Sequence, residues 1–500
     1  MIDILNNLTL GFSTALTPMH LLYCLFGVAI GTLIGVLPGI GPVATISMLL
    51  PITFKVEPVG ALIMLAGIYY GAQYGGSTTS ILINVPGEAT TVVTCIDGYQ
   101  MARQGRAGPA LGIAAMGSFF GGCVATMIIV LFAPVLTEFA LKFGAAEYFS
   151  LMVLGLVAAV VLAHGSLIKA IAMVFLGLLL GIIGTDVTSG TLRLTFGILD
   201  LSDGIDFVAI AMGLFGFAEI IANVGHKGKR KVFTSKVKGL MPTRADFKAS
   251  WKPVVRGTLL GSALGILPGG GALVSSFASY TLEKRVAADP SRFGKGAIEG
   301  VAGPESANNA GAQTSFIPLL TLGIPSNAVM ALMLGAMVLH GITPGPKVMI
   351  ERPELFWGMI ASMWIGNLIL VILNLPLIGI WVQLLTIPYR LLYPAILVFC
   401  CIGVYSLRNN PFDVVLTAGF GLLGYIFNKV DCEPAPLLLA FILGPMVEEN
   451  LRRAMLISRG DPTVFFMRPI SLAMLLVAAF LLILAIIPAV RRKREEAFQE

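Results

Sequence analysis

Two similar Gly-Pro stretches in this chain have the composition to bind an anion through backbone amides rather than through charged side chains. The first, GTLIGVLPGIGP, spans 31–42, and the second, GSALGILPGGG, spans 261–271. Each places a helix-breaking Pro-Gly cluster inside an otherwise apolar segment. Glycine lets backbone N–H groups approach a ligand closely, and a helix that restarts after the break presents free N–H groups and the positive end of its dipole. A carboxylate can be held in this way without an arginine.

Hydroxyl and amide side chains gather close to these breaks and in two further polar clusters. Such groups supply hydrogen bonds without a fixed charge, which suits a site inside a bilayer, where arginine is expensive. The residues predicted to bind substrate are Pro38, Gly39, Gly41, Pro42, Ser77, Thr78, Thr79, Ser80 and Asn84 in the first half of the chain, and Gly269, Gly270, Gly271, Ser275, Asn308, Asn309, Gln313, Thr314, Ser326 and Asn327 in the second.

Small residues also allow helices to pack closely in membranes, so glycine alone does not indicate a binding site. For four glycines spaced four residues apart, helix packing is the favoured interpretation: Gly31, Gly35, Gly261 and Gly265. For the Pro-Gly tips and for Asn308 and Asn309, ligand binding is favoured, because packing needs neither proline nor paired amides.

Glu305 is the acid inside the polar cluster GPESANNAGAQTS, which spans 303–315. A carboxylate within the membrane is functional by default, and this one could carry a proton or help to bind Na⁺. It could equally cap a helix that begins near Ser306. Both interpretations stay open, and Glu88 and Asp97 are weaker candidates for the same role.

No catalytic residue, metal centre or organic cofactor is expected. The sequence contains no GxxxxGK[ST] nucleotide-binding loop, no HExxH metal motif and no GxSxG nucleophile motif. The expected coupling ion is Na⁺ or H⁺.

The elements that must carry these residues are helices in a membrane. Hydrophobic residues make up 56% of the 500 residues and charged residues only 12%, against about 25% charged in soluble domains. The lengths of the apolar runs predict an all-α polytopic membrane protein with about 11–12 transmembrane helices. Broken helices or re-entrant hairpins at the Pro-Gly motifs survive at membrane depth only where they are buried in protein or line a polar cavity. The net charge of +6 comes from residues beside the apolar runs, so no nucleic-acid partner is expected.

Charge also predicts which side each connection faces. Segment 226–256 carries ten Lys and Arg against the single acid Asp246, which predicts a cytoplasmic loop. The connection 185–206 carries four aspartates against Arg193, as an external loop would, and residues 1–54 contain no Lys or Arg. The first motif is therefore entered from outside and the second from inside, which predicts inverted-topology repeats.

The repeat extends beyond the first motif, because INVPG at 83–87 resembles LGIPS at 322–326. We predict a first transmembrane repeat at 1–225, a basic cytoplasmic loop at 226–256, a second transmembrane repeat at 257–490 and a cytoplasmic tail at 491–500.

The same motifs resemble the TctA family, the large membrane subunit of bacterial tripartite tricarboxylate transporters. The resemblance is carried by GVLPGIGP at 35–42, YGGSTTSILINVPGE at 74–88, GILPGGG at 265–271 and, above all, PESANNAGAQTSFIPLLTLGIPSNAVMALMLGAMVLHGITPGP at 304–346. It covers essentially the whole chain, although the region after Trp357 matches mainly in hydropathy.

The resemblance implies a secondary transporter subunit of the bacterial inner membrane that imports a tricarboxylate or dicarboxylate, such as citrate, with an ion gradient. It also implies two partners: a small membrane subunit and a periplasmic solute-binding protein that delivers the substrate. Two alternatives from other classes are a membrane enzyme acting on a lipid-linked substrate and a passive anion channel. The enzyme would need a clustered acid–base or metal set, which the sequence does not offer, and the channel would not accumulate its solute against a gradient.

Overall fold

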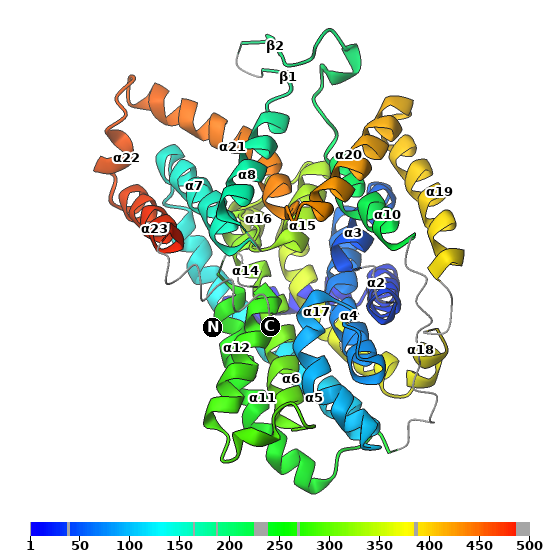
Figure 1. Cartoon of the computed structure of the whole chain (residues 1–500). Coiled ribbons are helices and arrows are strands. Elements are labelled where there is room, and N and C mark those ends of the chain that lie inside the picture. Colours follow the sequence, from blue (N-terminus) through cyan, green and yellow to red (C-terminus); the bar gives the residue numbers. More distant parts are fainter. Residues whose placement is uncertain are drawn as a thin grey trace.

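The computed structural model describes residues 2–37, 41–163, 166–186, 189–224, 239–267, 271–384 and 389–486. This part of the chain is almost entirely α-helical, as predicted. Its only strands are β1 (Gly184–Thr185) and β2 (Leu192–Arg193), an antiparallel hairpin at one end of the molecule (Figure 1).

Within the described residues, five helices are long and apolar enough to cross a membrane, and several shorter apolar helices accompany them. The prediction of an all-α polytopic membrane protein is therefore confirmed, whereas the number of crossings and the inverted topology stay predictions. The five helices are α2 (Pro18–Val36), α6 (Ala107–Ala140), α17 (Pro353–Asn374), α20 (Pro411–Lys429) and α23 (Pro469–Ile486).

The core is built from two series of helices that follow the same order along the chain. In the first half α2 packs along α4 (Pro58–Ile83), and in the second half α11 (Arg244–Gly265) packs along α13 (Glu299–Thr314). The two halves also pack on each other: α6 of the first half packs on α13, and α17 of the second half packs on α4. The other helices of the two series are α3 (Pro42–Thr53), α5 (Val92–Arg103), α12 (Gly271–Val286), α14 (Phe316–Leu322) and α15 (Ala328–Leu339).

Glycine allows the backbones of these helix pairs to touch. A Cβ atom placed on Gly31 in α2 would lie 2.4 Å from the Ile68 carbonyl oxygen of α4, and one on Gly261 in α11 would lie 2.2 Å from the Ala307 carbonyl oxygen of α13. No side chain fits at such distances. The packing role is thereby confirmed for all four glycines to which it was assigned: Gly31, Gly35, Gly261 and Gly265.

The second break of each half forms the same turn. Helix α4 ends at Asn84 with φ 58°, and α14 ends at Gly323 with φ 74°, both in the left-handed region. A proline follows two positions later in each case, Pro86 and Pro325. A left-handed residue closes a helix and a following proline cannot continue it, so the two matched sequence motifs build matched helix ends.

The basic segment is partly helical. The Thr243 hydroxyl and the Asp246 carboxylate form a reciprocal capping box that starts α11 at Arg244. The second half of the segment predicted as a loop, 226–256, is therefore the first part of α11. The segment 225–238 lies outside the described residues, as does the predicted tail 491–500.

Two groups of helices flank the core on opposite sides (Figure 1). On one side α7 (Ala145–Leu162) and α8 (Leu167–Gly181) pack on α21 (Ala435–Ile457), and α7 also packs on α23. On the other side α20 packs on a π-helical stretch and on α10 and α19. The elements not yet described are α9 (Phe207–Ala211), the π-helix η3 (Met212–Phe217), α10 (Ala218–Val224), α19 (Tyr389–Arg408), α1 (Ile2–Ala15), η1 (Ala89–Thr91), η2 (Leu199–Leu201), η4 (Pro290–Arg292), α16 (Lys347–Glu351), α18 (Ile378–Leu384) and α22 (Val464–Met467).

Candidate functional site

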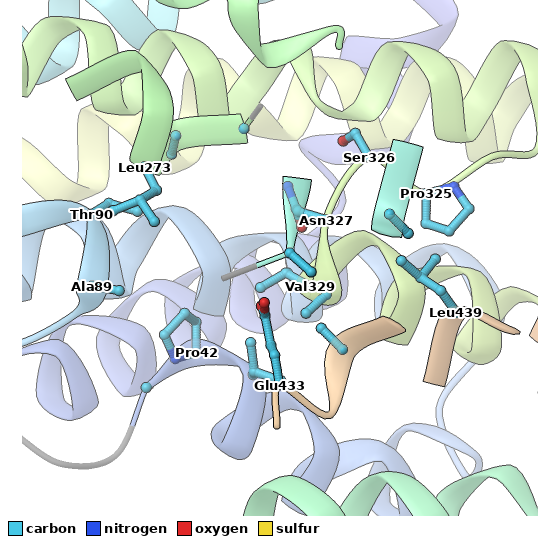
Figure 2. Close-up of a pocket in the computed structure, with 18 of the residues that line it drawn as sticks. Pro42, Ala89, Thr90, Leu273, Pro325, Ser326, Asn327, Val329, Glu433 and Leu439 are labelled. Atoms are coloured by element: carbon cyan, nitrogen blue, oxygen red, sulfur yellow. The ribbon is translucent and has the colours of Figure 1, made fainter. Parts of the chain in front are cut away.

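A cavity of about 290 Å³ lies where helices from both halves begin (Figure 2). Pro42 begins α3, Gly271 is the first residue of α12, Asn327 caps α15 and Ala435 begins α21, and all four residues line the cavity. The cavity thus joins the two Pro-Gly breaks to the break before α15 and to a helix start near the end of the chain.

The electrostatics of these helix starts favour negative charge. The first turn of a helix carries N–H groups without partners inside the helix and the positive end of its dipole. Several such starts facing one cavity add their effects, as at known anion sites on helix N-termini. Among the described residues that line the cavity there is no Lys or Arg.

The polar side chains of the cavity come from separate elements. Figure 2 shows Thr90, Asn327 and Glu433 around the same space, although they precede or belong to different helices. The Asn327 side-chain oxygen accepts from the Met330 amide at 2.9 Å, and its Nδ2 lies 3.4 Å from the hydroxyl of Tyr69, which also lines the cavity. The bond to the Met330 amide therefore holds the Asn327 side chain in place, while its Nδ2 group faces Tyr69 of the cavity.

Two carboxyl side chains, Glu88 and Glu433, also line the cavity. The Thr90 hydroxyl lies 3.0 Å from Glu88 Oε2. Asp97, the other weak candidate, does not line the cavity. Its carboxylate instead accepts from the backbone amides of Gly296 and Ala297 at 2.8 and 2.9 Å. The cavity therefore combines the positive ends of several helices with two carboxyl side chains.

Glu305 lies in a second cluster, away from the large cavity. Its side chain is fully buried in the middle of α13, with a Ser77 hydroxyl donating to Oε2 at 2.6 Å and a Thr94 hydroxyl donating to Oε1. Ser118 Oγ lies 3.4 Å from Oε2. Because α13 begins at Glu299, Glu305 is not at a helix start, and the interpretation as a cap is wrong.

The structure brings only part of the predicted set to the large cavity. The predicted residues that line it are Gly41, Pro42, Gly271, Ser326 and Asn327. Those described elsewhere are Ser77, Thr78, Thr79, Ser80, Asn84, Ser275, Asn308, Asn309, Gln313 and Thr314. Four predictions fall outside the described residues: Pro38, Gly39, Gly269 and Gly270.

Several of the hydroxyl groups that do not reach the cavity bond to the protein. Thr79 donates to the Val36 carbonyl oxygen at 2.9 Å, at the C-terminal end of α2. Ser80 donates to Thr91 Oγ1 at 2.9 Å. Because α4 continues as a buried helix through this segment, the Thr79 and Ser80 hydroxyls form hydrogen bonds with neighbouring elements. Asn84 is exposed at the left-handed end of that helix.

Two predicted amides stand out by their lack of protein partners. In the part of the chain that the structure describes, both side-chain polar atoms of Asn308 and both of Gln313 are buried without a hydrogen bond. Buried amides without a protein partner are rare and mark places where water or a ligand supplies the bonds. They belong to α13, the helix that also carries Glu305.

Sequence reasoning missed several cavity residues. Thr90 lies three positions after the INVPG motif. Its closeness to the motif is a signal by which the sequence could have placed it among the predicted binding residues. Tyr69 lies inside the long apolar run of α4, and Glu433 lies beyond the region with recognisable motifs. No local signal distinguishes Tyr69 and Glu433, because only the packing of α4 and α21 brings them to the cavity.

Comparison with known proteins gives a consistent result. The profile of the family described as "Tripartite tricarboxylate transporter TctA family" matches residues 21–439. A protein of Agrobacterium vitis described as an uncharacterized 52.8 kDa protein in the TAR-I ttuC' 3'region is 60% identical over 500 residues, all of both chains. Another from the same organism, described as an uncharacterized protein in the TAR-II ttuC' 3'region, is 64% identical over 240 residues, 48% of this chain and 99% of that protein. No solved structure matches.

Proposed function

The chain belongs to the tripartite tricarboxylate transporter TctA family, and on that premise we propose that it imports a tricarboxylate or dicarboxylate, citrate among them, by ion-coupled secondary transport. The proposed location is the bacterial inner membrane, with a cytoplasmic C-terminus. The proposed partners are a small membrane subunit and a periplasmic solute-binding protein that hands over the substrate.

The convergence of helix starts on one cavity is the observation that carries the proposal. The substrate carboxylates accept from the free N–H groups at the starts of α12 and α15, and the Tyr69 hydroxyl, which accepts from Asn327, supplies a further hydrogen bond. The remaining wall is largely apolar, with small residues such as Ala159 and with Leu439. Such a wall removes water and strengthens the polar contacts, while the absence of a fixed cationic ligand keeps release possible.

The two acids of the cavity are the reason to propose ion coupling. An anionic substrate next to a charged Glu88 is repelled unless a proton or cation enters with it. Glu305, buried in the adjoining helix bundle, is the proposed ion carrier. Solute and ion then cross together as the site opens alternately to the two sides.

The experiment is uptake of radiolabelled citrate and other carboxylates into proteoliposomes holding the chain and its small membrane subunit, with the binding protein outside. Na⁺ and pH gradients are imposed separately. We expect accumulation above the external concentration with at least one of the two gradients. Uptake that stops at equal concentrations favours the channel, and chemical conversion of a lipid-linked substrate favours the enzyme.

Glu88→Gln tests the role of the cavity acids. Removing this charge should lower the half-saturating substrate concentration by about threefold to tenfold and flatten its dependence on the coupling ion. Glu138→Gln is the matched control, because Glu138 is exposed near the end of α6. Unchanged substrate and ion dependence in Glu88→Gln would remove the charge-compensation argument.

A further inference from the structure

A small cavity of about 10 Å³ lies among α4, α6 and the end of α17, separate from the large one. This is about the volume needed to hold one water molecule. Its polar lining consists of oxygen-bearing side chains: Tyr74, Ser77, Thr78, Ser118 and Asn374. Apolar residues of α6 complete the wall.

Two of these side chains present oxygen atoms that no described residue satisfies. The Tyr74 hydroxyl and Asn374 Oδ1 are buried without a hydrogen-bond partner, in side chains of residues that are only 3% and 5% exposed. Asn374 Nδ2 donates to the Leu370 carbonyl oxygen at 2.9 Å, which leaves the amide oxygen as its unused group. Buried oxygens left without a partner at the wall of a cavity of this size indicate that a bound species completes them.

The carboxyl group of Glu305 adjoins the same cavity. Ser77 Oγ and Ser118 Oγ, which belong to residues that line it, lie 2.6 and 3.4 Å from Glu305 Oε2. The Ser77 and Thr94 hydroxyl groups bond to the two oxygens of the Glu305 carboxyl group. Among the described ion pairs none includes Glu305. A fully buried carboxyl group without an ion pair is neutralised either by a proton or by a bound cation.

We propose that the small cavity is a Na⁺ site, formed by the oxygens of Tyr74, Ser77, Ser118 and Asn374 beside the carboxylate of Glu305. Oxygen ligands suit a hard cation, and one carboxylate among neutral oxygens suits a single positive charge. The described residues contain no group of three or more His, Cys, Asp or Glu that would hold a divalent or transition metal. The inference rests on the proposed transport function, for which it identifies the coupling ion.

The site joins the two halves of the chain. Tyr74, Ser77 and Ser118 come from the first half, whereas Glu305 and Asn374 come from the second. A cation bound here offsets the charge of Glu305 and holds α4 and α6 against α13. Occupancy of the small cavity is thereby coupled to the packing of α4, which also contributes Tyr69 to the large cavity.

The test measures thermal unfolding of the purified full-length chain in detergent, in NaCl, KCl or choline chloride at constant ionic strength. A ligand that binds only the folded state raises the melting temperature as its concentration rises. We expect a saturable rise with NaCl and none with choline chloride. Tyr74→Phe should increase the half-saturating Na⁺ concentration about tenfold, equivalent to about 1.4 kcal/mol, and Glu305→Gln should abolish the response.

Tyr70→Phe is the matched control. Tyr70 lies one turn earlier on α4, and its hydroxyl is also buried without a partner among the described residues, but it does not line the small cavity. It should keep the wild-type Na⁺ response. If Glu305→Gln does not fold, the Na⁺ responses of Tyr74→Phe and Tyr70→Phe still decide whether the small cavity binds Na⁺.

Equal melting temperatures in NaCl and choline chloride, or equal Na⁺ responses of Tyr74→Phe and Tyr70→Phe, would overturn the Na⁺ site and leave a buried water in its place. Uptake in Na⁺-free medium separates this failure from that of the transport proposal. Carboxylate accumulation driven by a proton gradient alone, with no Na⁺ effect on stability, removes the Na⁺ site and leaves the transport function standing.

Discussion

Ser77 Oγ donates to Glu305 Oε2 at 2.6 Å, joining α4 of the first half to α13 of the second across 228 positions of sequence. Both side chains are buried, at 4% and 0% exposure. A charge-assisted bond of this length is among the stronger hydrogen bonds in proteins. The two halves are therefore connected at their centre by a polar contact in addition to the packing of helix on helix.

Replacing Ser77 by alanine should test this connection. The change leaves one carboxylate oxygen of Glu305 without its best donor, so we expect a loss of about 1–3 kcal/mol in the free energy of unfolding. Ser47→Ala is the control, since that buried hydroxyl only donates to Ala44 in its own helix. Thermal unfolding in detergent gives the comparison, and equal losses in the two variants would contradict a special role for the contact.

Asn327→Asp tests the large cavity as an anion site. Aspartate also caps a helix well, so α15 should keep its start while the cavity gains a negative charge. We expect the efficiency of carboxylate uptake to fall at least about tenfold. Asn84→Asp makes the same change at the exposed, matched end of α4, where aspartate tolerates the left-handed conformation. Equal uptake by both variants would remove Asn327 from the site.

The sequence could predict the helical membrane fold and the equivalence of its breaks, because both follow from local composition. A left-handed residue followed by a proline commonly closes a helix, so the turns at Asn84 and Gly323 could be matched from letters alone. The direction of a helical side chain cannot be read in that way. Thr79 and Asn327 are both polar and near a break, yet Thr79 bonds to α2 while Asn327 lines the cavity.

Long-range packing accounts for the remaining differences. Glu433 reaches the cavity only because α21 lies against the core, and nothing near it in sequence indicates that position. Glu305 was identified as a buried acid, but its three hydroxyl neighbours come from three other helices. The interpretation as a cap failed because α13 begins a full turn and more before Glu305, at Glu299.

Gly31→Ala and Gly261→Ala test the close helix packing of each half. A Cβ at either position would meet a backbone carbonyl oxygen at 2.4 or 2.2 Å, so the helices must separate. We expect each variant to lose about 1–3 kcal/mol in the free energy of unfolding. Gly419→Ala in α20 is the control with opposite sign, because no atom lies within 4 Å of its added Cβ and alanine favours a helix by about 1 kcal/mol. Similar losses at all three glycines would contradict the packing role.

The Arg106–Asp246 ion pair predicts a pH effect at the basic end of the molecule. It joins the residue before α6 to the first turn of α11, outside the apolar part of that helix. Burial acts to raise the pKa of Asp246, but the Thr243 hydroxyl, the Thr243 amide and the Arg106 guanidinium outweigh it and lower the pKa below its usual value. A lowered pKa means that the contribution to stability is present above the unfolded pKa and is lost as pH falls through the folded pKa.

Asp246→Asn should therefore be less stable than wild type at neutral pH, and the difference should shrink as pH falls below 4. Thermal unfolding in detergent at a series of pH values measures it. Glu449→Gln serves as the control, because Glu449 forms only an exposed ion pair with Arg453 one turn away, and such pairs contribute little. A difference between Asp246→Asn and wild type that stays constant from neutral to acidic pH would show that the carboxylate charge is not what holds α11 to α6.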